Sequence, residues 1–341
     1  MTTICTLGSH CSLQVLKGAK DEGFGTLLVC ERKRERLYRR FSFIDELLLV
    51  DSFNEILEPK NKSRLNERKS VIIPHGTLIS QMDSSQIESI DVPVFGNKWI
   101  LRWESDRNMK EKLMIESKLC IPRSLASPSD IDGLVIAKRH GAAGGKGYFL
   151  ATSKKDYEEK RDKLVSQGII KGDADLYLQE YAFGVSAYLQ YFYSPLDDNL
   201  EFFGVDRRYE SDIDGLGRIP SQQQIGIDKI PSFNVVGNSP LVLRESLLDE
   251  VYSMGERFVE AARRLVAPGM NGPFCLEGVY DENAKFTTFE FSSRIVAGTN
   301  LYVDGSPYST FLYDEPMSMG RRIAREIKIA EKADRISQIT T

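Results

Sequence analysis

Two glutamates in the last third of the sequence have the type and spacing of a metal-binding pair. Glu277 lies in PFCLEGVY and Glu290 in TTFEFSSR, and the segment between them has turn residues at Asn283 and Ala284. An antiparallel hairpin with this turn places the two glutamates directly opposite each other, with Cβ atoms ~5 Å apart. Their neighbours are apolar, so the carboxylates repel each other unless they share a proton or a cation. Mg²⁺ commonly takes one or two carboxylates together with nucleotide phosphates. The pair therefore predicts a magnesium site, and the alternative is a solvated sheet face with two unrelated glutamates.

A glycine-rich segment earlier in the chain could hold the phosphates. It runs from His140 to Gly147 as HGAAGGKG and contains Lys146, and Lys138 comes shortly before it. Small residues let backbone N–H groups approach an anion closely, and the lysine adds positive charge. The segment is neither a Walker loop nor a GxGxxG fingerprint. It joins two predicted strands, which indicates a flap over phosphates, with an exposed glycine hairpin as the alternative. Loop and glutamates together imply a Mg–nucleotide site, with kinase, hydrolase and ligase chemistry all open.

One arginine and the histidines complete the set of candidate residues. Arg294 continues the strand face of Glu290 and offers a guanidinium for an anion. The sequence has only three histidines, His10, His75 and His140, and each lies beside a glycine or in a serine–glycine turn. We therefore expect these histidines to lie near ligands.

The elements that position these residues begin with an alternation of strands and helices. Four strand-like segments are separated by helical patterns and glycine turns, at 2–7, 24–30, 46–50 and 71–74. Ser12 is the expected cap of the first helix. Such alternation indicates a parallel open sheet, in which ligands bind beyond the carboxyl ends of the strands. His10 and His75 lie at those ends.

The rest of the chain mixes helices with strands that follow one another directly. Helices are predicted over 106–118, 153–168, 245–266 and 316–333. Strands are predicted over 134–139, 148–152, 176–181, 187–194, 200–205, 274–280 and 285–292. A chain of 341 residues exceeds the ~250–300 residues at which single cores stop growing, so we expect two or three subdomains.

The composition argues against several classes of function. The net charge of −4, from 45 Lys and Arg against 49 Asp and Glu, lacks the cation excess of a nucleic-acid-coating protein. The basic run 31–40 is interpreted as a solvated helix face or loop, with a nucleic-acid patch as the weaker alternative. No apolar run approaches the ~18 residues of a membrane span, and the N-terminus lacks a signal-peptide pattern. We expect a cytoplasmic protein that binds neither nucleic acid nor membrane.

The five cysteines are scattered and form no CxxC pair. This spacing predicts neither a zinc site nor a disulfide framework. Cys5, Cys30 and Cys275 lie in apolar stretches, so we expect them in the core.

The order of these signals resembles the ATP-grasp superfamily. A helix lysine, Lys110 or Lys112, precedes the strand lysine, the flap, a hinge strand LQEY and the two glutamates. The likeness extends through most of the chain, in the segments TLGSHCSLQVLKGAKDEGF, IPHGT, VPVFGNKWILRWESDR, YFYSPL, LEFFGVDRRYESDIDGLGRIP, VVGN, LRESLL, PGMNGPFCLEG and FEFSSRIVAGTNLYVDGSPYS. By these segments the chain resembles the archaeal formate-dependent 5-formaminoimidazole-4-carboxamide ribonucleotide synthetases.

The resemblance implies a fold and an activity. The fold is α/β, with α+β character in the ATP-binding part: an ATP-grasp fold preceded by a Rossmann-like parallel-sheet domain. The domains would span residues 1–100, 101–185, with the flap, and 186–341, with the metal carboxylates. The family uses ATP and formate to formylate the amine of 5-aminoimidazole-4-carboxamide ribonucleotide through formyl phosphate, in purine biosynthesis. It also implies Mg²⁺, with Mn²⁺ as an alternative, and a homo-oligomer, a hexamer or trimer.

The resemblance also assigns roles to residues of this sequence. His10 and Arg294 would be catalytic, and His10, Thr77 and Asn238 would contact the ribonucleotide. Glu277 and Glu290 would hold the metal. The ATP-binding residues would be Lys110, Lys138, Lys146, Gln179, Glu180, Tyr181 and Glu210.

Some positions depart from the pattern. Val185 and Ser186 stand where many ATP-grasp enzymes have a ribose-binding glutamate, so Glu210 or Asp206 would take that role. Ser292 replaces the usual asparagine after the second metal glutamate, and Cys11 replaces a more frequent serine, which argues against substrate contact at Cys11.

Two rival functions remain at this point. One is an enzyme of the same fold that uses another acid or amine. The other is a non-catalytic ATP-binding regulator, against which the intact Lys138, Lys146, Glu277 and Glu290 argue.

Overall fold

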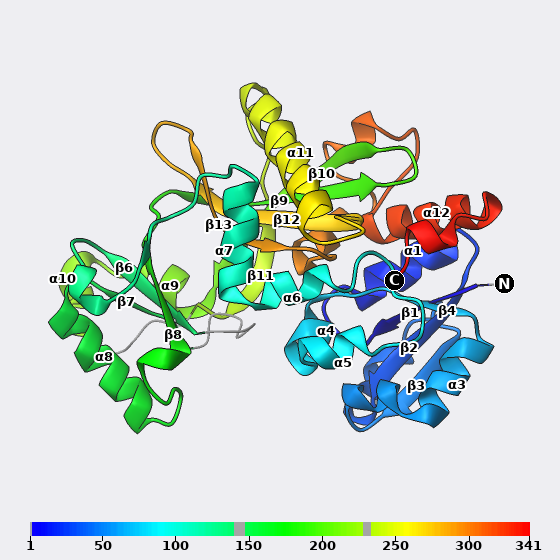
Figure 1. Cartoon of the computed structure of the whole chain (residues 1–341), viewed down its shortest axis with the longest axis horizontal. Coiled ribbons are helices and arrows are strands. Elements are labelled where there is room, and N and C mark those ends of the chain that lie inside the picture. Colours follow the sequence, from blue (N-terminus) through cyan, green and yellow to red (C-terminus); the bar gives the residue numbers. More distant parts are fainter. Residues whose placement is uncertain (1, 140–146, 228–232) are drawn as a thin grey trace.

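Three sheets organise the chain, one parallel and two antiparallel. The computed structural model describes residues 2–139, 147–227 and 233–341. A parallel sheet from the N-terminal region and a small antiparallel sheet lie at opposite ends of the molecule, and a five-stranded antiparallel sheet lies between them (Figure 1). The parallel N-terminal sheet and the antiparallel sheets that follow agree with the predicted α/β and α+β parts.

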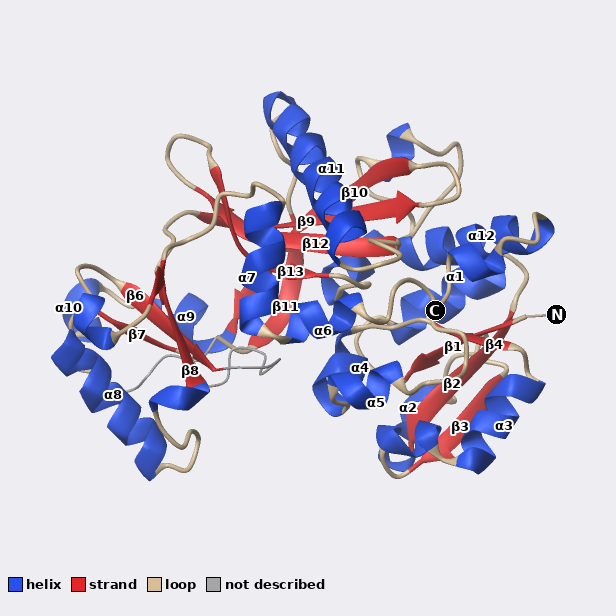
Figure 2. Ribbon diagram, viewed as in Figure 1, coloured by secondary structure: helices blue, strands red, loops and turns tan. Residues whose placement is uncertain are grey.

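The N-terminal sheet has the order β3-β2-β1-β4, with all neighbours parallel. Its strands are β1 (Thr3–Leu7), β2 (Gly25–Glu31), β3 (Glu46–Val50) and β4 (Ser70–Ile72). The helices of this region are α1 (Ser12–Asp21), α2 (Glu35–Tyr38), α3 (Pro59–Glu67), α4 (Gly76–Gln81) and α5 (Ser84–Glu88). The alternation of strands and helices, which Figure 2 shows by colour, confirms the predicted parallel sheet. One detail was wrong, because Cys11 occupies the N-cap position of α1 and Ser12 is its first residue.

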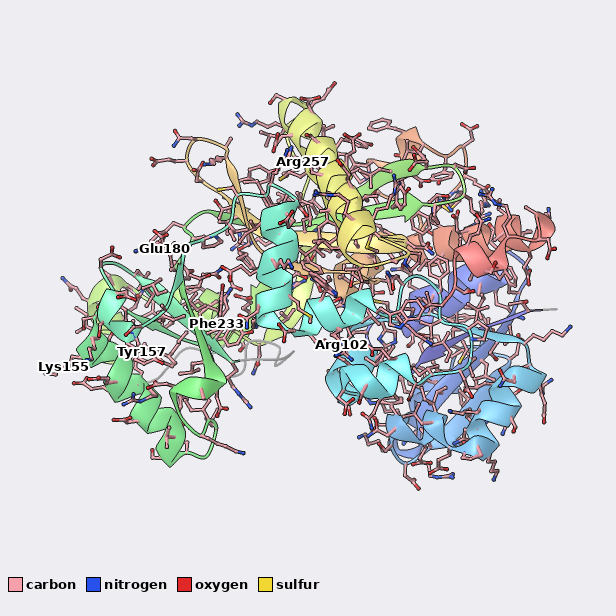
Figure 3. All side chains as sticks on the ribbon, in the orientation of Figure 1. Arg102, Lys155, Tyr157, Glu180, Phe233 and Arg257 are labelled. Atoms are coloured by element: carbon pink, nitrogen blue, oxygen red, sulfur yellow. The ribbon has the colours of Figure 1, made fainter. Side chains whose placement is uncertain are left out.

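The small sheet has the order β5-β8-β6-β7 and is antiparallel. Its strands are β5 (Ser124–Leu125), β6 (Val135–Arg139), β7 (Phe149–Ala151) and β8 (Leu176–Glu180). Helix α8 (Lys154–Ser166) begins after Ser153, whose hydroxyl accepts from the Asp156 backbone N–H at 3.2 Å. The helix covers the sheet with Tyr157, which is buried, while Lys155 points outward (Figure 3).

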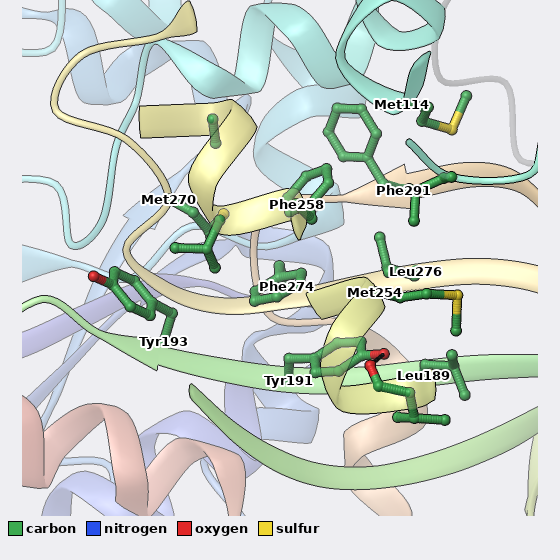
Figure 4. Close-up of a cluster of buried hydrophobic side chains, with 14 of the residues drawn as sticks. Met114, Leu189, Tyr191, Tyr193, Met254, Phe258, Met270, Phe274, Leu276 and Phe291 are labelled. Carbon is green, nitrogen blue, oxygen red and sulfur yellow. Dashed lines mark hydrogen bonds between the residues drawn. The ribbon is translucent and has the colours of Figure 1, made fainter. Parts of the chain in front are cut away.

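The central sheet has the order β11-β10-β9-β12-β13. Its strands are β9 (Val185–Ser194), β10 (Asn199–Glu210), β11 (Val235–Pro240), β12 (Gly272–Tyr280) and β13 (Phe286–Ser292). Because successive side chains point to opposite faces, Leu189, Tyr191 and Leu276 pack on one face against α11 (Leu248–Leu265), as Figure 4 shows. The opposite face packs Phe192 against the core of the N-terminal unit and carries Glu277 and Glu290 on the wall of a cavity.

The remaining helices connect these units. They are α6 (Ile100–Ser105), α7 (Arg107–Glu116), α9 (Ser211–Leu216), α10 (Ser221–Gln224) and α12 (Met319–Lys332). Helix α12 packs on α1, and the backbone groups of Thr341 and Val94 exchange hydrogen bonds at 3.0 and 2.9 Å. The end of the chain therefore completes the core of the N-terminal unit.

Several local predictions can be checked here. The basic run 31–40 forms a 3-10 turn, Arg32–Arg34, and α2, with exposed basic side chains paired to acids, as expected of a solvated face. Cys5, Cys30 and Cys275 are buried free thiols, which confirms their place in the core. Within the described ranges, every helix is too short or too polar to cross a membrane.

Candidate functional site

A cavity of about 780 Å³ lies where the three sheets meet. The N-terminal unit contributes His10 and Gly76, the small sheet contributes Lys138 and Gln179, and the central sheet contributes its polar face. Most residues to which the sequence assigned a role therefore converge on one space, although they come from distant parts of the chain.

The central sheet aligns four polar side chains across neighbouring strands. Glu290 pairs with Glu277 in the β13–β12 register, Glu277 pairs with Tyr188, and Tyr188 pairs with Asp206. Paired residues project on the same face of an antiparallel sheet. The predicted opposition of the two glutamates is confirmed. The same row of paired side chains continues onto β9 with Tyr188 and onto β10 with Asp206.

Cations surround both glutamates. Glu290 accepts from Lys110 and, at 3.3 Å, from Arg107. Glu277 accepts from Arg208 at 2.8 Å and from the Ser292 hydroxyl at 2.7 Å.

These cations decide the ionisation of Glu290. Burial alone would raise the pKa of its carboxyl, but the charges of Lys110 and Arg107, and of nearby Lys138, outweigh burial and hold that pKa well below its usual range. Glu290 is therefore ionised in the folded protein at neutral pH.

Two of these cations were missed from the sequence. Arg107 also donates to the Tyr148 hydroxyl at 2.7 Å, and Arg208 stacks 3.8 Å from the ring centroid of Tyr188. Spacing carried a usable signal, because Arg107 lies three residues before Lys110 on a predicted helix and so shares its face. Arg208 lies two residues after Asp206, on the same face of β10. The predicted strand ended at residue 205, whereas β10 continues to Glu210, so Arg208 was not placed on it.

The lysines predicted to bind ATP differ in their burial. Lys110 is buried beside Glu290, whereas Lys112 is exposed, so Lys110 is the helix lysine of the site. Lys138 is also buried and donates to the Gln179 side-chain oxygen at 2.9 Å. Burial lowers the pKa of Lys138 to about 8, with Glu290 opposing this effect and Arg107 adding to it. Lys146 and His140 lie outside the described residues.

The hinge residues and Glu210 line the same cavity. Gln179 and Glu180 are the last two residues of β8 and Tyr181 follows them, and all three line the cavity. Glu210, at the end of β10, also lines the cavity, and burial raises its pKa to about 7, although Arg208 opposes this. Asp206, the other residue suggested for the ribose, is 1 % exposed and is not among the residues that line the cavity.

The two N-terminal histidines have different surroundings. His75 is buried and accepts from the Thr77 backbone N–H at 3.2 Å through Nδ1, so it caps α4. Its Nε2 must then carry the proton and donates to the Leu7 carbonyl at 2.8 Å. His10 faces the cavity with its ring parallel to that of His75, at a centroid distance of 5.8 Å.

His10 is held in an unusual backbone conformation and is neutral. Its φ of 49° lies in the left-handed region, and a Cβ on Gly76 would overlap its imidazole. Burial, and then the charges of Arg294 and Arg208, lower the pKa of His10 to about 4. The imidazole is therefore uncharged at neutral pH and can accept a hydrogen bond.

The other predicted contact residues divide between the cavity wall and the buried interior. Asn238 and Arg294 line it, and Arg294 pairs with Glu104 at 2.9 Å. Thr77 is buried one residue after Gly76; Gly76 and Ser80 line the cavity, whereas Thr77 does not.

The two glutamates fit a divalent cation that also takes ligands from a nucleotide. Two opposed carboxylates and the Ser292 hydroxyl supply hard oxygen atoms on one face. In the described part of the chain, no group of three or more His, Cys, Asp or Glu residues could hold a metal ion. The remaining ligands would therefore have to come from phosphates and water.

Comparisons with known proteins agree with this arrangement. Residues 156–341 match a family model described as a domain of unknown function (DUF1297), and residues 4–125 match a protein of unknown function (DUF1246). The chain is 66% identical, over 100% of both chains, to the 5-formaminoimidazole-4-carboxamide-1-(beta)-D-ribofuranosyl 5'-monophosphate synthetase of Nitrosopumilus maritimus.

Solved structures extend the likeness to the fold. The IMP biosynthesis protein PurP from Thermococcus kodakaraensis is 30% identical, with a TM-score of 0.79 over 99% of this chain and 100% of that chain. The N5-carboxyaminoimidazole ribonucleotide synthetase purK, solved as an ADP complex, is 11% identical with a TM-score of 0.67, over 95% of this chain and 76% of that chain. The second likeness concerns the fold alone, which is the ATP-grasp fold.

Proposed function

Because the chain belongs to the family of 5-formaminoimidazole-4-carboxamide ribonucleotide synthetases, we propose that it is an ATP-dependent ligase that joins formate to the amine of 5-aminoimidazole-4-carboxamide ribonucleotide, in purine biosynthesis. One observation carries the proposal beyond the likeness. The opposed Glu277 and Glu290, the cations Lys110, Lys138 and Arg208, and the neutral His10 all line a single cavity. At about 780 Å³ the cavity lies within the size range of ligand sites, and in this proposal ATP lies at the end of the small sheet and the ribonucleotide beside His10.

The first half of the reaction activates formate. A formate oxygen attacks the γ-phosphorus of ATP, formyl phosphate forms and ADP leaves. Lys110, Arg107 and Lys138 stabilise the negative charge that develops on the transferred phosphoryl group. Glu277 and Glu290 would hold Mg²⁺, with Mn²⁺ as an alternative, and the ion would supply further charge stabilisation.

The second half transfers the formyl group. The ribonucleotide amine attacks the formyl carbon, the bond from that carbon to the phosphate oxygen breaks, and the amine proton passes to the departing phosphate. His10, neutral at the pH of the reaction, accepts a hydrogen bond from the ribonucleotide and orients it. Arg294, fixed by Glu104, offers its guanidinium to the acyl phosphate.

The nucleotide would lie along the small sheet. Gln179 and Glu180, with the backbone near Tyr181, would hold the adenine, and Glu210 would hold the ribose hydroxyls. Glu210 lines the cavity and Asp206 does not, which supports Glu210 for this role.

The test is release of ADP with formate, the ribonucleotide and Mg²⁺, each omitted in turn. Turnover that needs all three supports the ligase. Turnover with another acid or amine would identify a relative with altered specificity, and tight ATP binding without turnover would identify a regulator.

The assembly and location belong to the same proposal. We propose a cytoplasmic homo-oligomer, a trimer or a hexamer, on the family resemblance. Light scattering coupled to size exclusion tests it, and a monomer at micromolar concentration would contradict it.

A further inference from the structure

We propose that Asp206 is a positioning residue that determines specificity, because it fixes the side-chain amide of Asn238 with its carbonyl oxygen toward the carboxamide N–H₂ of the ribonucleotide. This inference rests on the proposed function and deepens it. It concerns which group of the ribonucleotide forms a hydrogen bond with Asn238.

The contact between the two side chains is short and its direction is fixed. Asn238 donates from Nδ2 to Asp206 Oδ2 at 2.7 Å. An ionised carboxylate only accepts hydrogen bonds, whereas an amide has one end that donates and one that accepts. The carboxylate therefore holds the Nδ2 end, and Asn238 Oδ1 has no partner among the described residues.

Asp206 is held in place from the other side. Its Oδ1 accepts from Gln190 Nε2 at 2.6 Å, and the side chain is almost fully buried. Gly298 closes the space above it, because a Cβ there would overlap the Asp206 carboxylate. Each carboxylate oxygen of Asp206 thus accepts a hydrogen bond from a side-chain amide N–H₂. Because a carboxylate cannot donate, neither amide can turn its oxygen toward Asp206, so the orientation of Asn238 is set before any ligand binds.

Asn238 itself is half-buried and lines the cavity at the end that His10 and Arg294 share. It lies opposite Arg208 in the β10–β11 register, so both project on the face that carries the glutamates. A free amide oxygen on this face pairs with a donor and repels another acceptor.

The proposed substrate offers such a donor. Its 5-amine must face the formyl carbon in order to react, and its 4-carboxamide has a separate N–H₂ group. A site built to accept a hydrogen bond rejects an analogue that lacks the donor, because a polar group is then left unpaired. The 4-carboxylate analogue places two acceptors against each other, so the cavity should discriminate against it.

The experiment measures binding of the carboxamide ribonucleotide and of its 4-carboxylate analogue by calorimetry. Wild type is expected to bind the carboxamide at least about tenfold more tightly, which corresponds to ~1.4 kcal/mol. In Asp206→Asn, the Asn238 amide can turn and offer its N–H₂ to the ligand. The ratio of the two affinities, carboxamide over carboxylate, should then fall to within about threefold of unity. The KM for ATP and for formate should stay within about twofold of wild type, because Asp206 does not line the cavity.

A second variant covers the case in which Asp206→Asn fails to fold. Gly298→Ala displaces the same carboxylate without removing its charge, and it should lower the ratio in the same direction. The matched control is Asp198→Asn, an exposed aspartate in the turn between β9 and β10, which should leave the ratio unchanged.

The outcomes separate this proposal from the proposed function. Equal binding of both ligands by wild type, or an unchanged ratio in folded Asp206→Asn or Gly298→Ala, would overturn it. A purely structural role would weaken both ligands equally. Calorimetry needs no turnover. Absence of ligase activity in the omission assay would therefore refute the proposed function and leave the measured ratio of carboxamide to carboxylate affinity unchanged.

Discussion

At the scale of residues, the cations around the glutamate pair outnumber its two carboxylates. Lys110, Arg107, Lys138 and Arg208 lie around two carboxylates, Glu277 and Glu290, so the cluster has four positive and two negative charges. A net positive cluster attracts a triphosphate and repels a free divalent cation. The arrangement therefore suits a metal that arrives with its nucleotide.

The charge balance predicts the order of binding. Mn²⁺ titrated into nucleotide-free protein should show no saturable binding up to roughly 1 mM, because the carboxylates are already paired with cations. With ADP present, the phosphates draw Lys110 and Arg107 away, and the apparent affinity should rise at least about tenfold. Electron paramagnetic resonance of free Mn²⁺ measures both cases. Tight binding without nucleotide would contradict the expectation.

Glu290→Gln is expected to abolish turnover. The amide removes a metal ligand and also leaves Lys110 and Arg107 without their acceptor. The ion pairs therefore predict a loss of stability of about 1–3 kcal/mol as well, measured by urea denaturation.

Glu282→Gln is the matched control for this change, because it lies exposed in the turn of the same hairpin. It should alter neither turnover nor unfolding. Residual turnover of Glu290→Gln above a few per cent of wild type would show that Glu290 is not a required metal ligand.

The sequence was sufficient for the glutamate pair, Lys110 and Lys138, and insufficient for Arg107 and Arg208. Hairpin register is local, so Glu277 and Glu290 could be placed opposite each other from their spacing. Arg208 reaches Glu277 across β9, and the contact of Asn238 with Asp206 depends on β11 pairing with β10. Such contacts depend on how strands from separate segments pair, which no local pattern reports.

At the scale of elements, α4 is tied to β1 by a single buried imidazole. His75 caps the helix through Nδ1 and donates to the Leu7 carbonyl through Nε2, so both ring nitrogens are used. Protonation of Nδ1 would remove the cap and place a charge in the core.

This linkage predicts how stability depends on pH. Burial, and then the nearby His10, lower the pKa of His75 to about 3, whereas the unfolded chain has the ordinary value of 6.5. Below pH 6.5 the unfolded state therefore binds the extra proton, and stability that is complete above this pH is lost on acidification. The free energy of unfolding should fall by up to ~1.4 kcal/mol per pH unit between pH 6 and 4 because of this residue.

His75→Asn provides the comparison, since asparagine also caps helices. It should be less stable than wild type at pH 7, by about 1–3 kcal/mol, because the bond to Leu7 is lost. Its slope between pH 6 and 4 should be shallower by up to ~1.4 kcal/mol per unit. Equal slopes in urea denaturation would show that His75 does not titrate as proposed.

The crossing of α1 and α12 depends on two glycines. A Cβ at Gly18 would overlap the backbone of Gly320 and Arg321, and a Cβ at Gly320 would overlap the backbone of Gln14. Backbone atoms cannot yield as side chains do, so the two helices can only approach this closely without side chains at the crossing.

Gly320→Ala is expected to lower the free energy of unfolding by about 1–3 kcal/mol, because the helices must move apart. Gly215→Ala is the control, because Gly215 lies in α9 with nothing within 4 Å of the added Cβ. It should be neutral or stabilising by up to about 1 kcal/mol. A Gly320→Ala variant as stable as wild type would mean that the crossing is not tightly packed.

At the scale of the whole molecule, the strand and helix types were predictable and their mutual arrangement was not. The alternating N-terminal pattern predicted the parallel sheet, and the helix predicted over 245–266 corresponds to α11. The short elements β5, β11, α4 and α9 carry no periodic pattern, so they could not be predicted. The packing of α12 on α1 joins segments about three hundred residues apart, and the predicted domain boundaries at residues 100 and 185 stay predictions.

The return of the chain end to the N-terminal unit has a consequence for synthesis on the ribosome. Ile323 and Ile327 of α12 share a core with Leu16 and Ala19 of α1. The part of the apolar face of α1 that α12 covers therefore stays open until about three hundred further residues have been made. The core of the parallel-sheet unit is thus completed only after the strands of both antiparallel sheets have been translated, and chaperones that shield nascent apolar surfaces should bind this protein through its α1 segment.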